Sequence, residues 1–150
     1  MTISIILPSF NYSWCIGQAI ESVVNQSYQD WELIIVDDCS SDDSIDVIKR
    51  YIDNKPKKIR LLSNPKNIGL AKTYERGVNH SVGEYIAFIE SDDIWSQDKL
   101  KTQIATMERN PSVVLSYTDI ELFGTKNDYF MKRAAEIERY KISFKIAEGP

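Results

Sequence analysis

Two short segments of the chain place acidic residues directly after apolar runs, and these carboxylates could do chemistry. Residues 33–38 read LIIVDD, and residues 85–93 read YIAFIESDD. Hard divalent cations such as Mg²⁺ and Mn²⁺ prefer oxygen ligands of this kind, and carboxylates also accept hydrogen bonds from hydroxyl groups. If the two acidic ends lie next to each other, they form a site for a metal ion and a hydroxylated ligand.

The apolar runs before these carboxylates are predicted to be buried strands. Five such strands are predicted, at residues 3–7, 31–36, 59–62, 85–89 and 113–117. Segments with apolar residues at helical spacing alternate with them, beginning near Trp14, after Asp43, at Gly69 and near Ser96. Near-continuous apolar strands are typical of burial on both faces, so the pattern predicts an α/β fold with a mostly parallel sheet and helices on both faces.

Ligands of open parallel sheets bind beyond the carboxyl ends of the strands. The segments after Leu7, Val36 and Ile89 all follow such ends, and they hold many of the most polar residues of the chain. We therefore expect the three turns to converge on one cleft.

Composition and charge set limits on the class of protein. The 150 residues predict a single domain, and the apolar share of 43% with a charged share of 27% is typical of a soluble globular protein. A formal net charge of -4 argues against a general nucleic-acid surface. No apolar stretch is long enough to span a membrane, and Cys15 and Cys39 are interpreted as reduced thiols of a cytosolic protein. Beyond Asp119 the pattern weakens, with a turn-like stretch at 121–129, a helical one at 130–140 and alternation at 142–146.

Four motifs, taken in order, resemble those of the family 2 glycosyltransferases, which are inverting enzymes of the GT-A fold that use nucleotide-activated sugars. The motifs are SIILPSFN at 4–11, SVVNQSYQDWELIIVDDCSSD at 22–42, NIGLA at 67–71 and GEYIAFIESDDIW at 83–95. The resemblance implies a Rossmann-like nucleotide-sugar-binding domain with a donor-binding core at 1–119. Residues 120–150 would lead towards the acceptor half, where the chain is expected to be truncated.

The resemblance gives the acidic loop after Ile89 a role in holding the diphosphate. Asp92 matches the ligand of a divalent metal, Mn²⁺ or Mg²⁺. Glu90 and Ser91 match positions that face the ribose and diphosphate, with Glu90 standing where many relatives carry Asp. The structural alternative is that Ser91, Asp92 or Asp93 only caps the helix expected to begin near Ser96.

The first two loops are implied to bind the nucleoside. Pro8, Ser9 and Phe10 match the loop that packs on the base and ribose, and Asp38 matches the acceptor of a nucleobase N–H. Asp37 would point to the opposite face and support the loop, because adjacent side chains of a strand alternate. The alternatives are a core position for Phe10 and simple capping by the two aspartates.

Residues 72–77 depart from the family pattern. Many relatives carry Ala-Arg-Asn-x-Gly here, whereas this chain reads Thr73-Tyr74-Glu75-Arg76-Gly77. Two residues along a helix rotate a side chain by about 200°, so Arg76 is not expected to replace the missing arginine. Lys72 or Tyr74 could reach the nucleotide instead, with a solvated helix face as the alternative for Lys72.

The resemblance implies inverting transfer of a sugar from a nucleoside-diphosphate donor, most plainly a UDP-linked one, to a saccharide or lipid-linked acceptor. The catalytic base is expected beyond Pro150, and Asp119 is interpreted as acceptor-side lining or as structural. The resemblance also implies a cytoplasmic protein that associates peripherally with the inner face of a membrane. One alternative is a sugar-nucleotide-binding module without turnover. A phosphoacceptor signalling domain is disfavoured because its acid pair should follow the first strand and not the second.

Overall fold

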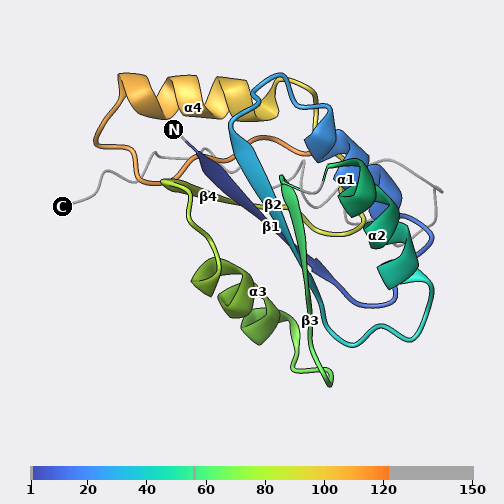
Figure 1. The fold of residues 1–150 in the computed structure, drawn as a ribbon. Coiled ribbons are helices and arrows are strands. Elements are labelled where there is room, and N and C mark those ends of the chain that lie inside the picture. The colour runs from blue at the N-terminus through green and yellow to red at the C-terminus, as the bar shows by residue number, and fades with distance from the viewer. Residues whose placement is uncertain (1, 56, 122–150) are drawn as a thin grey trace, which may run out of the picture. The chain divides into compact units, whose positions relative to one another are not determined.

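Strands and helices alternate along the chain, as the sequence pattern predicts. The computed structural model describes residues 2–55 and 57–121. The elements are β1 (Ile3–Ser9), α1 (Ile16–Val24), β2 (Trp31–Asp37), α2 (Ser44–Asn54), β3 (Ile59–Ser63), α3 (Leu70–Asn79), β4 (Tyr85–Phe88) and α4 (Lys99–Arg109). The four strands form one parallel sheet in the order β3-β2-β1-β4 (Figure 1). The α/β class with a parallel sheet is thereby confirmed.

Helices cover both faces of this sheet. Ile6, Ile34 and Val36 point to one face, where they pack with Tyr74 and Val78 of α3. The residues that alternate with them on β1 and β2 point the other way and are fully buried; they include Ile5, Leu7, Leu33 and Ile35. In Figure 1, α1 and α2 lie across the sheet from α3. This two-sided burial explains why the strands are apolar at nearly every position.

Pro8 sits inside the central strand β1, which is an unusual place for proline because it cannot donate to the ladder. The carbonyl of Ile6 accepts the N–H of Ile89 at 3.1 Å, so Ile6 and, two residues on, Pro8 present their backbone groups to the β4 side. The pairing of β4 with β1 ends at Phe88, opposite Ile6. Pro8 therefore lies where no strand partner needs its missing N–H.

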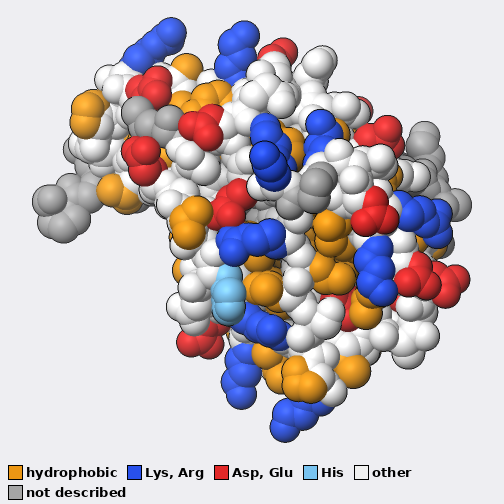
Figure 2. All heavy atoms as spheres, in the orientation of Figure 1, with side chains coloured by type: hydrophobic (Ala, Val, Ile, Leu, Met, Phe, Trp, Pro, Cys, Tyr) orange, Lys and Arg blue, Asp and Glu red, His pale blue; other side chains and the backbone are white. Residues whose placement is uncertain are grey.

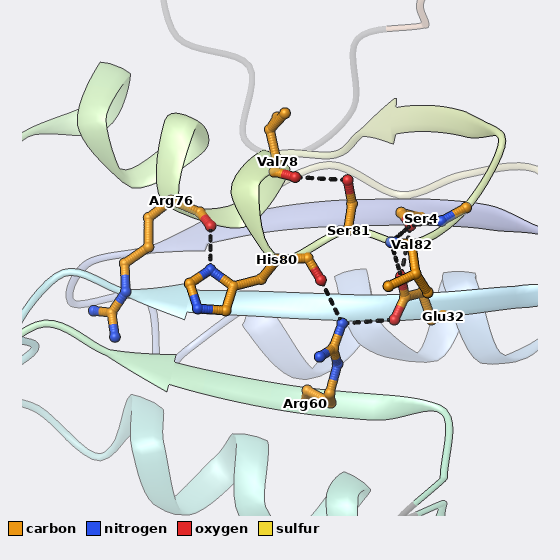
Figure 3. Close-up of polar contacts among 9 residues, drawn as sticks. Ser4, Glu32, Arg60, Arg76, Val78, His80, Ser81 and Val82 are labelled. Atoms are coloured by element: carbon orange, nitrogen blue, oxygen red, sulfur yellow. Dashed lines mark hydrogen bonds and ion pairs between the residues drawn. The ribbon is translucent and has the colours of Figure 1, made fainter.

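The amino edge of the sheet is held by a polar cluster around Glu32 (Figure 3). The Glu32 carboxylate accepts hydrogen bonds from the Ser4 hydroxyl at 2.6 Å and the Val82 N–H at 3.0 Å, and pairs with the Arg60 guanidinium at 2.8 Å. Arg60 also donates to the His80 carbonyl at 2.7 Å. The cluster ties β1, β2 and β3 to the end of α3.

Two sequence predictions at the later part of the chain are wrong. Helix α4 begins at Lys99 and not near Ser96. The predicted fifth strand at 113–117 is absent: only Val113 forms a single bridge, and Val114 and Leu115 are exposed. An apolar run becomes a strand only where a neighbour takes up its backbone groups, and the described residues offer none after Val113.

The chain has two compact units: Met1–Lys101 holds the whole sheet, and the second unit starts at Thr102. The described part of the second unit, up to residue 121, contains the rest of α4 and irregular chain. The predicted elements at 130–140 and 142–146 lie outside the described residues. None of the described helices is both long and apolar enough to cross a membrane.

Candidate functional site

The turns after β1, β2 and β4 meet at the carboxyl edge of the sheet. The Asp38 N–H donates to the Ser9 carbonyl at 2.8 Å, which joins the end of β2 to the end of β1. The Ser91 hydroxyl donates to the Pro8 carbonyl at 2.7 Å, which joins the acidic loop to the same strand end. The end of β1 therefore supports both acidic segments, so the three turns meet as expected, whereas a cleft between them stays a prediction.

The loop after β1 is also cross-linked to the loop after β2. The Asn11 N–H donates to the Ser40 hydroxyl at 2.9 Å, and the Asn11 side chain accepts the Ser41 N–H at 2.8 Å. Asn11 and Cys39 both adopt left-handed backbone conformations, with φ of 59° and 69°. Such conformations are uncommon for residues other than glycine and cluster at functional loops. Here the cross-links hold them in place.

Asp37 and Asp38 have separate roles, as the alternation of a strand predicts. Asp37 accepts the backbone N–H of Ser40 at 2.9 Å and also its hydroxyl, so it supports the loop after β2. Asp38 points to the α3 side and accepts hydrogen bonds from the Asn64 amide at 2.7 Å and from the N–H groups of Ile68 and Gly69 at 2.9 Å each. Its carboxylate thereby fixes the turn that leads into α3.

The Asp38 carboxylate is a buried negative charge held by dipoles. The residue is only 4% exposed. Burial alone would raise its pKa, but hydrogen bonds from the Ile68 N–H, the Asn64 amide and the Gly69 N–H outweigh burial and hold the pKa below its ordinary value. Among the described residues no cation pairs with it. A hydrogen bond from the Thr73 side chain lowers the pKa of Asp38 further, so several donors from the turn and from α3 hold this carboxylate.

The acidic loop after Ile89 presents exposed carboxylates beside anchored ones. Asp92 and Asp93 are exposed, whereas Ser91 is buried. The Glu90 carboxylate accepts the Tyr74 hydroxyl from α3. Burial, followed by the charge of Asp92, raises the pKa of Asp93. Because α4 begins at Lys99, none of these residues caps that helix, and the capping alternative is wrong.

Tyr12 and Cys15 lie beside the acidic loop. The negative charge of Asp92 is the main cause that raises the pKa of Tyr12. The Cys15 thiol donates to the Ser91 carbonyl at 3.4 Å, and burial, with a further contribution from Asp92, raises its pKa to about 11. Cys15 is thus a neutral buried thiol that packs the loop, and both cysteines are free.

The donor set of the acidic loop fits a metal ion that is shared with a ligand. No group of three or more His, Cys, Asp or Glu side chains able to hold a metal occurs in the described parts of the chain. Asp92 is exposed, and its carboxylate has no hydrogen-bond or ion-pair partner among those residues. Mg²⁺ is commonly bound through one or two carboxylates plus substrate phosphates, and a lone Asp92 suits that mode.

The remaining predicted site residues lie at the same edge with different exposure. Phe10 is 43% exposed, so the core alternative for it is wrong. Ser9 is buried, and its hydroxyl has no hydrogen-bond partner among the described residues. Lys72 is exposed in the first turn of α3. Arg76, as expected, points elsewhere: its guanidinium donates to the Ser63 carbonyl and to Asn64.

Sequence reasoning missed the partners of the two key carboxylates. Asn64 is buried directly after β3, and its amide holds Asp38. The Tyr74 hydroxyl donates to Glu90, and the Tyr74 ring lies edge-on to Phe88 at a centroid distance of 5.2 Å. Asn64 could have been found from the sequence, because it is a polar residue directly after a strand end. The contact of Tyr74 could not, because it depends on how α3 packs.

Comparison with known proteins gives a consistent result. The family model described as Glycosyl transferase family 2 matches residues 4–148. An uncharacterized glycosyltransferase of Haemophilus influenzae is 43% identical over 126 residues, which cover 83% of this chain and 50% of that protein. The Escherichia coli UDP-Glc:alpha-D-GlcNAc-diphosphoundecaprenol beta-1,3-glucosyltransferase WfgD is 35% identical over 125 residues, 83% of this chain and 48% of that protein. The chain spans about half the length of these curated relatives.

Solved structures share the fold. S. aureus TarS 1-349 in complex with UDP superposes with a TM-score of 0.72 at 23% identity, covering 87% of this chain and 39% of that one. The mannosyltransferase PcManGT from Pyrobaculum calidifontis, in complex with GDP-Man and Mn2+, gives a TM-score of 0.69 at 22% identity over 74% of this chain and 33% of that one. These likenesses establish the GT-A type of α/β fold.

Proposed function

Because the chain belongs to glycosyl transferase family 2, we propose that it binds a nucleoside-diphosphate sugar and contributes to inverting transfer of that sugar to a saccharide or lipid-linked acceptor. The observation that carries the proposal is the shared support of Asp38 and the acidic loop at the end of β1. A nucleoside diphosphate needs contacts to its base and to its phosphates within one ligand length, and this junction would supply both.

The nucleoside would lie over the end of β1. The exposed ring of Phe10 can stack on a base, a contact that contributes about 1–3 kcal/mol in nucleic-acid binding. Asp38 would accept a nucleobase N–H, as suits uracil, alongside the groups of the chain that already donate to it. Pro8 and Ser9 would line the ribose. The UDP complex of TarS supports a UDP-linked donor.

The phosphates would lie over the acidic loop. Asp92 would hold Mn²⁺ or Mg²⁺, and the bound ion would neutralise charge on the leaving diphosphate. Glu90 would accept a ribose hydroxyl, Ser91 would keep the loop against Pro8, and Lys72 would approach the diphosphate from α3. The Mn2+ complex of PcManGT supports the metal. No described residue is assigned as the base that takes the acceptor proton.

We place this work at the cytoplasmic face of a membrane. The name of WfgD gives its acceptor as a diphosphoundecaprenol-linked sugar, and such a lipid stays in the bilayer. An acceptor of this type requires the enzyme to work at the membrane surface.

A thermal-shift measurement with UDP, in the presence and absence of Mn²⁺, tests the proposal. UDP should raise the melting temperature only when Mn²⁺ is present, and Asp92→Ala should abolish that shift. Asp53→Ala is the matched control because it removes an exposed carboxylate from the end of α2, away from the acidic loop. Equal shifts for the two variants would contradict the assignment of Asp92.

A transfer assay separates this proposal from binding without turnover. The assay measures release of UDP from a UDP-sugar with a lipid-linked saccharide as the acceptor. Saturable binding of UDP with no release above the level of the Asp92→Ala variant would favour the sugar-nucleotide-binding module.

A further inference from the structure

The basic residues are distributed very unevenly along the chain. Residues 1–48 contain no lysine or arginine, although the whole chain has 18. The segment 49–76 contains nine of them, with Asp53 and Glu75 as its only acidic residues. A protein with a net charge of -4 therefore carries one strongly positive segment.

The fold brings this segment to one side of the sheet. It comprises the second half of α2, the edge strand β3, the loop after β3 and the first turns of α3. Figure 2 shows lysine and arginine side chains spread over β3 and the two flanking helices, with acidic side chains elsewhere on the same face and some beside the basic ones. We call this surface the basic face; its residues are Lys49, Arg50, Lys55, Lys57, Lys58, Arg60, Lys66, Lys72 and Arg76.

Most charges on the basic face are not neutralised. Arg60 pairs with Glu32 (Figure 3), and Lys49 lies 3.8 Å from Asp46. Five further basic residues are exposed and, within the described part of the chain, form no ion pair: Arg50, Lys55, Lys57, Lys66 and Lys72. Like charges at this density repel one another, and an anionic partner would remove that repulsion.

Protection of an open strand edge explains only part of this pattern. Lysine and arginine on an edge strand prevent pairing with other chains, and Lys58 and Arg60 suffice for that on β3. The exposed lysines at 55, 66 and 72 lie before and after the strand, where there is no edge to protect.

The basic face reaches the rim of the candidate donor site. Lys66 lies two residues before Ile68, and Lys72 lies three residues after Gly69. The N–H groups of Ile68 and Gly69 hold the Asp38 carboxylate. A surface bound along this face would therefore end beside the nucleotide.

We propose that the basic face docks the protein onto an anionic membrane surface, with anionic lipid headgroups as its partner. The proposal rests on the proposed function, because a lipid-linked acceptor would then meet the donor site at the bilayer. The lysines are spread over an open surface, and this arrangement matches a flat, fluid array of lipid headgroups. Each basic side chain near such a surface strengthens binding by about fivefold. Residues 1–48, which carry acidic but no basic side chains, would be repelled by such a surface, and this favours one orientation.

Vesicle sedimentation of the full chain tests the proposal. The probes are vesicles of phosphatidylcholine alone and vesicles of equal parts phosphatidylcholine and phosphatidylglycerol. Wild-type protein should bind only the anionic vesicles, and binding should weaken as salt is raised. The double variant Lys55→Glu/Lys57→Glu should lose at least about 25-fold in affinity, since two contacts are removed.

A matched control is available on α4. Lys101→Glu/Arg109→Glu makes the same change in net charge at two exposed positions outside the basic face and should lose less than about twofold. Equal losses for the two variants, binding to neutral vesicles, or no binding to anionic vesicles would overturn the proposal. Binding of duplex RNA that only the Lys55/Lys57 variant loses would assign the face to nucleic acid and also overturn it.

Thermal shift with UDP and Mn²⁺ is recorded on the same protein samples. If the shift is present and vesicle binding is absent, the docking proposal fails alone. If UDP gives no shift in wild-type protein, the proposed function fails whatever the vesicles show.

Discussion

Two carboxylates on one face of β2 both accept hydrogen bonds, but only one of them also pairs with a cation. Glu32, near the amino edge, accepts the Ser4 hydroxyl and the Val82 N–H and pairs with the Arg60 guanidinium at 2.8 Å. Asp38, just beyond the carboxyl edge, accepts hydrogen bonds from one side-chain amide and from the N–H groups of Ile68 and Gly69. Both carboxylates have lowered pKa values, although burial acts against this in each case.

The difference lies in what each arrangement leaves behind. At Glu32 a cation cancels the charge, and the carboxylate serves as a structural link between strands. At Asp38 dipoles stabilise the charge without cancelling it, so an acceptor with negative potential remains at the edge where ligands of parallel sheets bind. The same chemical group on the same strand face thus supports the fold at one end and the candidate site at the other.

The substitution expected to cost most is Asp38→Ala. It leaves the buried Asn64 amide and the N–H groups of Ile68 and Gly69 without their acceptor, and an unpaired buried donor costs about 1–3 kcal/mol. We expect a loss of about 3 kcal/mol or more in the free energy of unfolding, measured by urea denaturation. UDP with Mn²⁺ should then no longer raise the melting temperature of the variant, provided that the variant is folded before it melts. If the free energy of unfolding fell by less than about 1 kcal/mol, the Asn64 amide and the N–H groups of Ile68 and Gly69 would not need Asp38 as their acceptor.

Arg60→Met is expected to cost less and to spare ligand binding. It leaves Glu32 without its cation, but Arg60 is 44% exposed as a side chain, so solvent screens the pair and a loss of about 1 kcal/mol is expected. A double-mutant cycle with Glu32→Gln measures the coupling directly. The UDP shift should be unchanged, and a change comparable to that of Asp38→Ala would remove the distinction between the two ends.

The pH dependence sharpens the comparison. Because the folded-state pKa values of Asp38 and Glu32 are lowered, their stabilisation is complete above the unfolded values of about 3.9 and 4.3 and is lost as pH falls through the folded values. The free energy of unfolding should therefore fall as the pH drops below about 5. Asp38→Asn and Glu32→Gln should each flatten that decline, and Asp42, with a pKa of about 2, accounts for part of what remains.

High salt separates the two carboxylates in the same titration. It should shrink the contribution of the Glu32 ion pair and leave that of Asp38 nearly unchanged, since hydrogen bonds inside the fold are little screened. Equal salt sensitivity of the Glu32→Gln and Asp38→Asn effects would contradict this.

The smallest effect is expected for Tyr74→Phe. The ring contact with Phe88 is kept and only the hydrogen bond to Glu90 is lost, so the free energy of unfolding should fall by about 0.5–1.5 kcal/mol. If Glu90 binds the ribose, the affinity for UDP should fall as well, while the affinity for Mn²⁺ alone should not. Val78→Ala on the same helix is a control that removes packing without touching Glu90.

The sequence was sufficient for most of the sheet and for the edge that carries the candidate site. Strands buried on both faces produce continuous apolar runs, and β1, β2 and β3 lie where those runs predict. The structure extends β1 by Pro8 and Ser9, β2 by Asp37 and β3 by Ser63. The prediction of a strand at 113–117 was wrong because an apolar run does not by itself provide a neighbouring strand to pair with. The helix predicted to begin near Ser96 is present as α4 but begins later than expected, at Lys99, whose ammonium group sits over the ring of Trp95 at 5.2 Å.

Contacts within the site were harder to predict than the positions of its carboxylates. The acidic residues follow strand ends, and topology brings strand ends together. The partners Asn64 and Tyr74 depend on how the turn before α3 and the helix itself pack, which no local pattern encodes. The left-handed conformations at Asn11 and Cys39 likewise follow from cross-links between two loops.

Pro8 has a consequence for how the candidate site is made ready. Because no hydrogen exists on its nitrogen, strand pairing on the β4 side cannot continue past this point, and the chain after Ile89 must leave the sheet. The Pro8 carbonyl, freed from the ladder, receives the Ser91 hydroxyl and fixes the departing loop. The covalent structure of one residue thus preorganises the loop before a donor arrives, so that less conformational entropy is lost when the ligand binds.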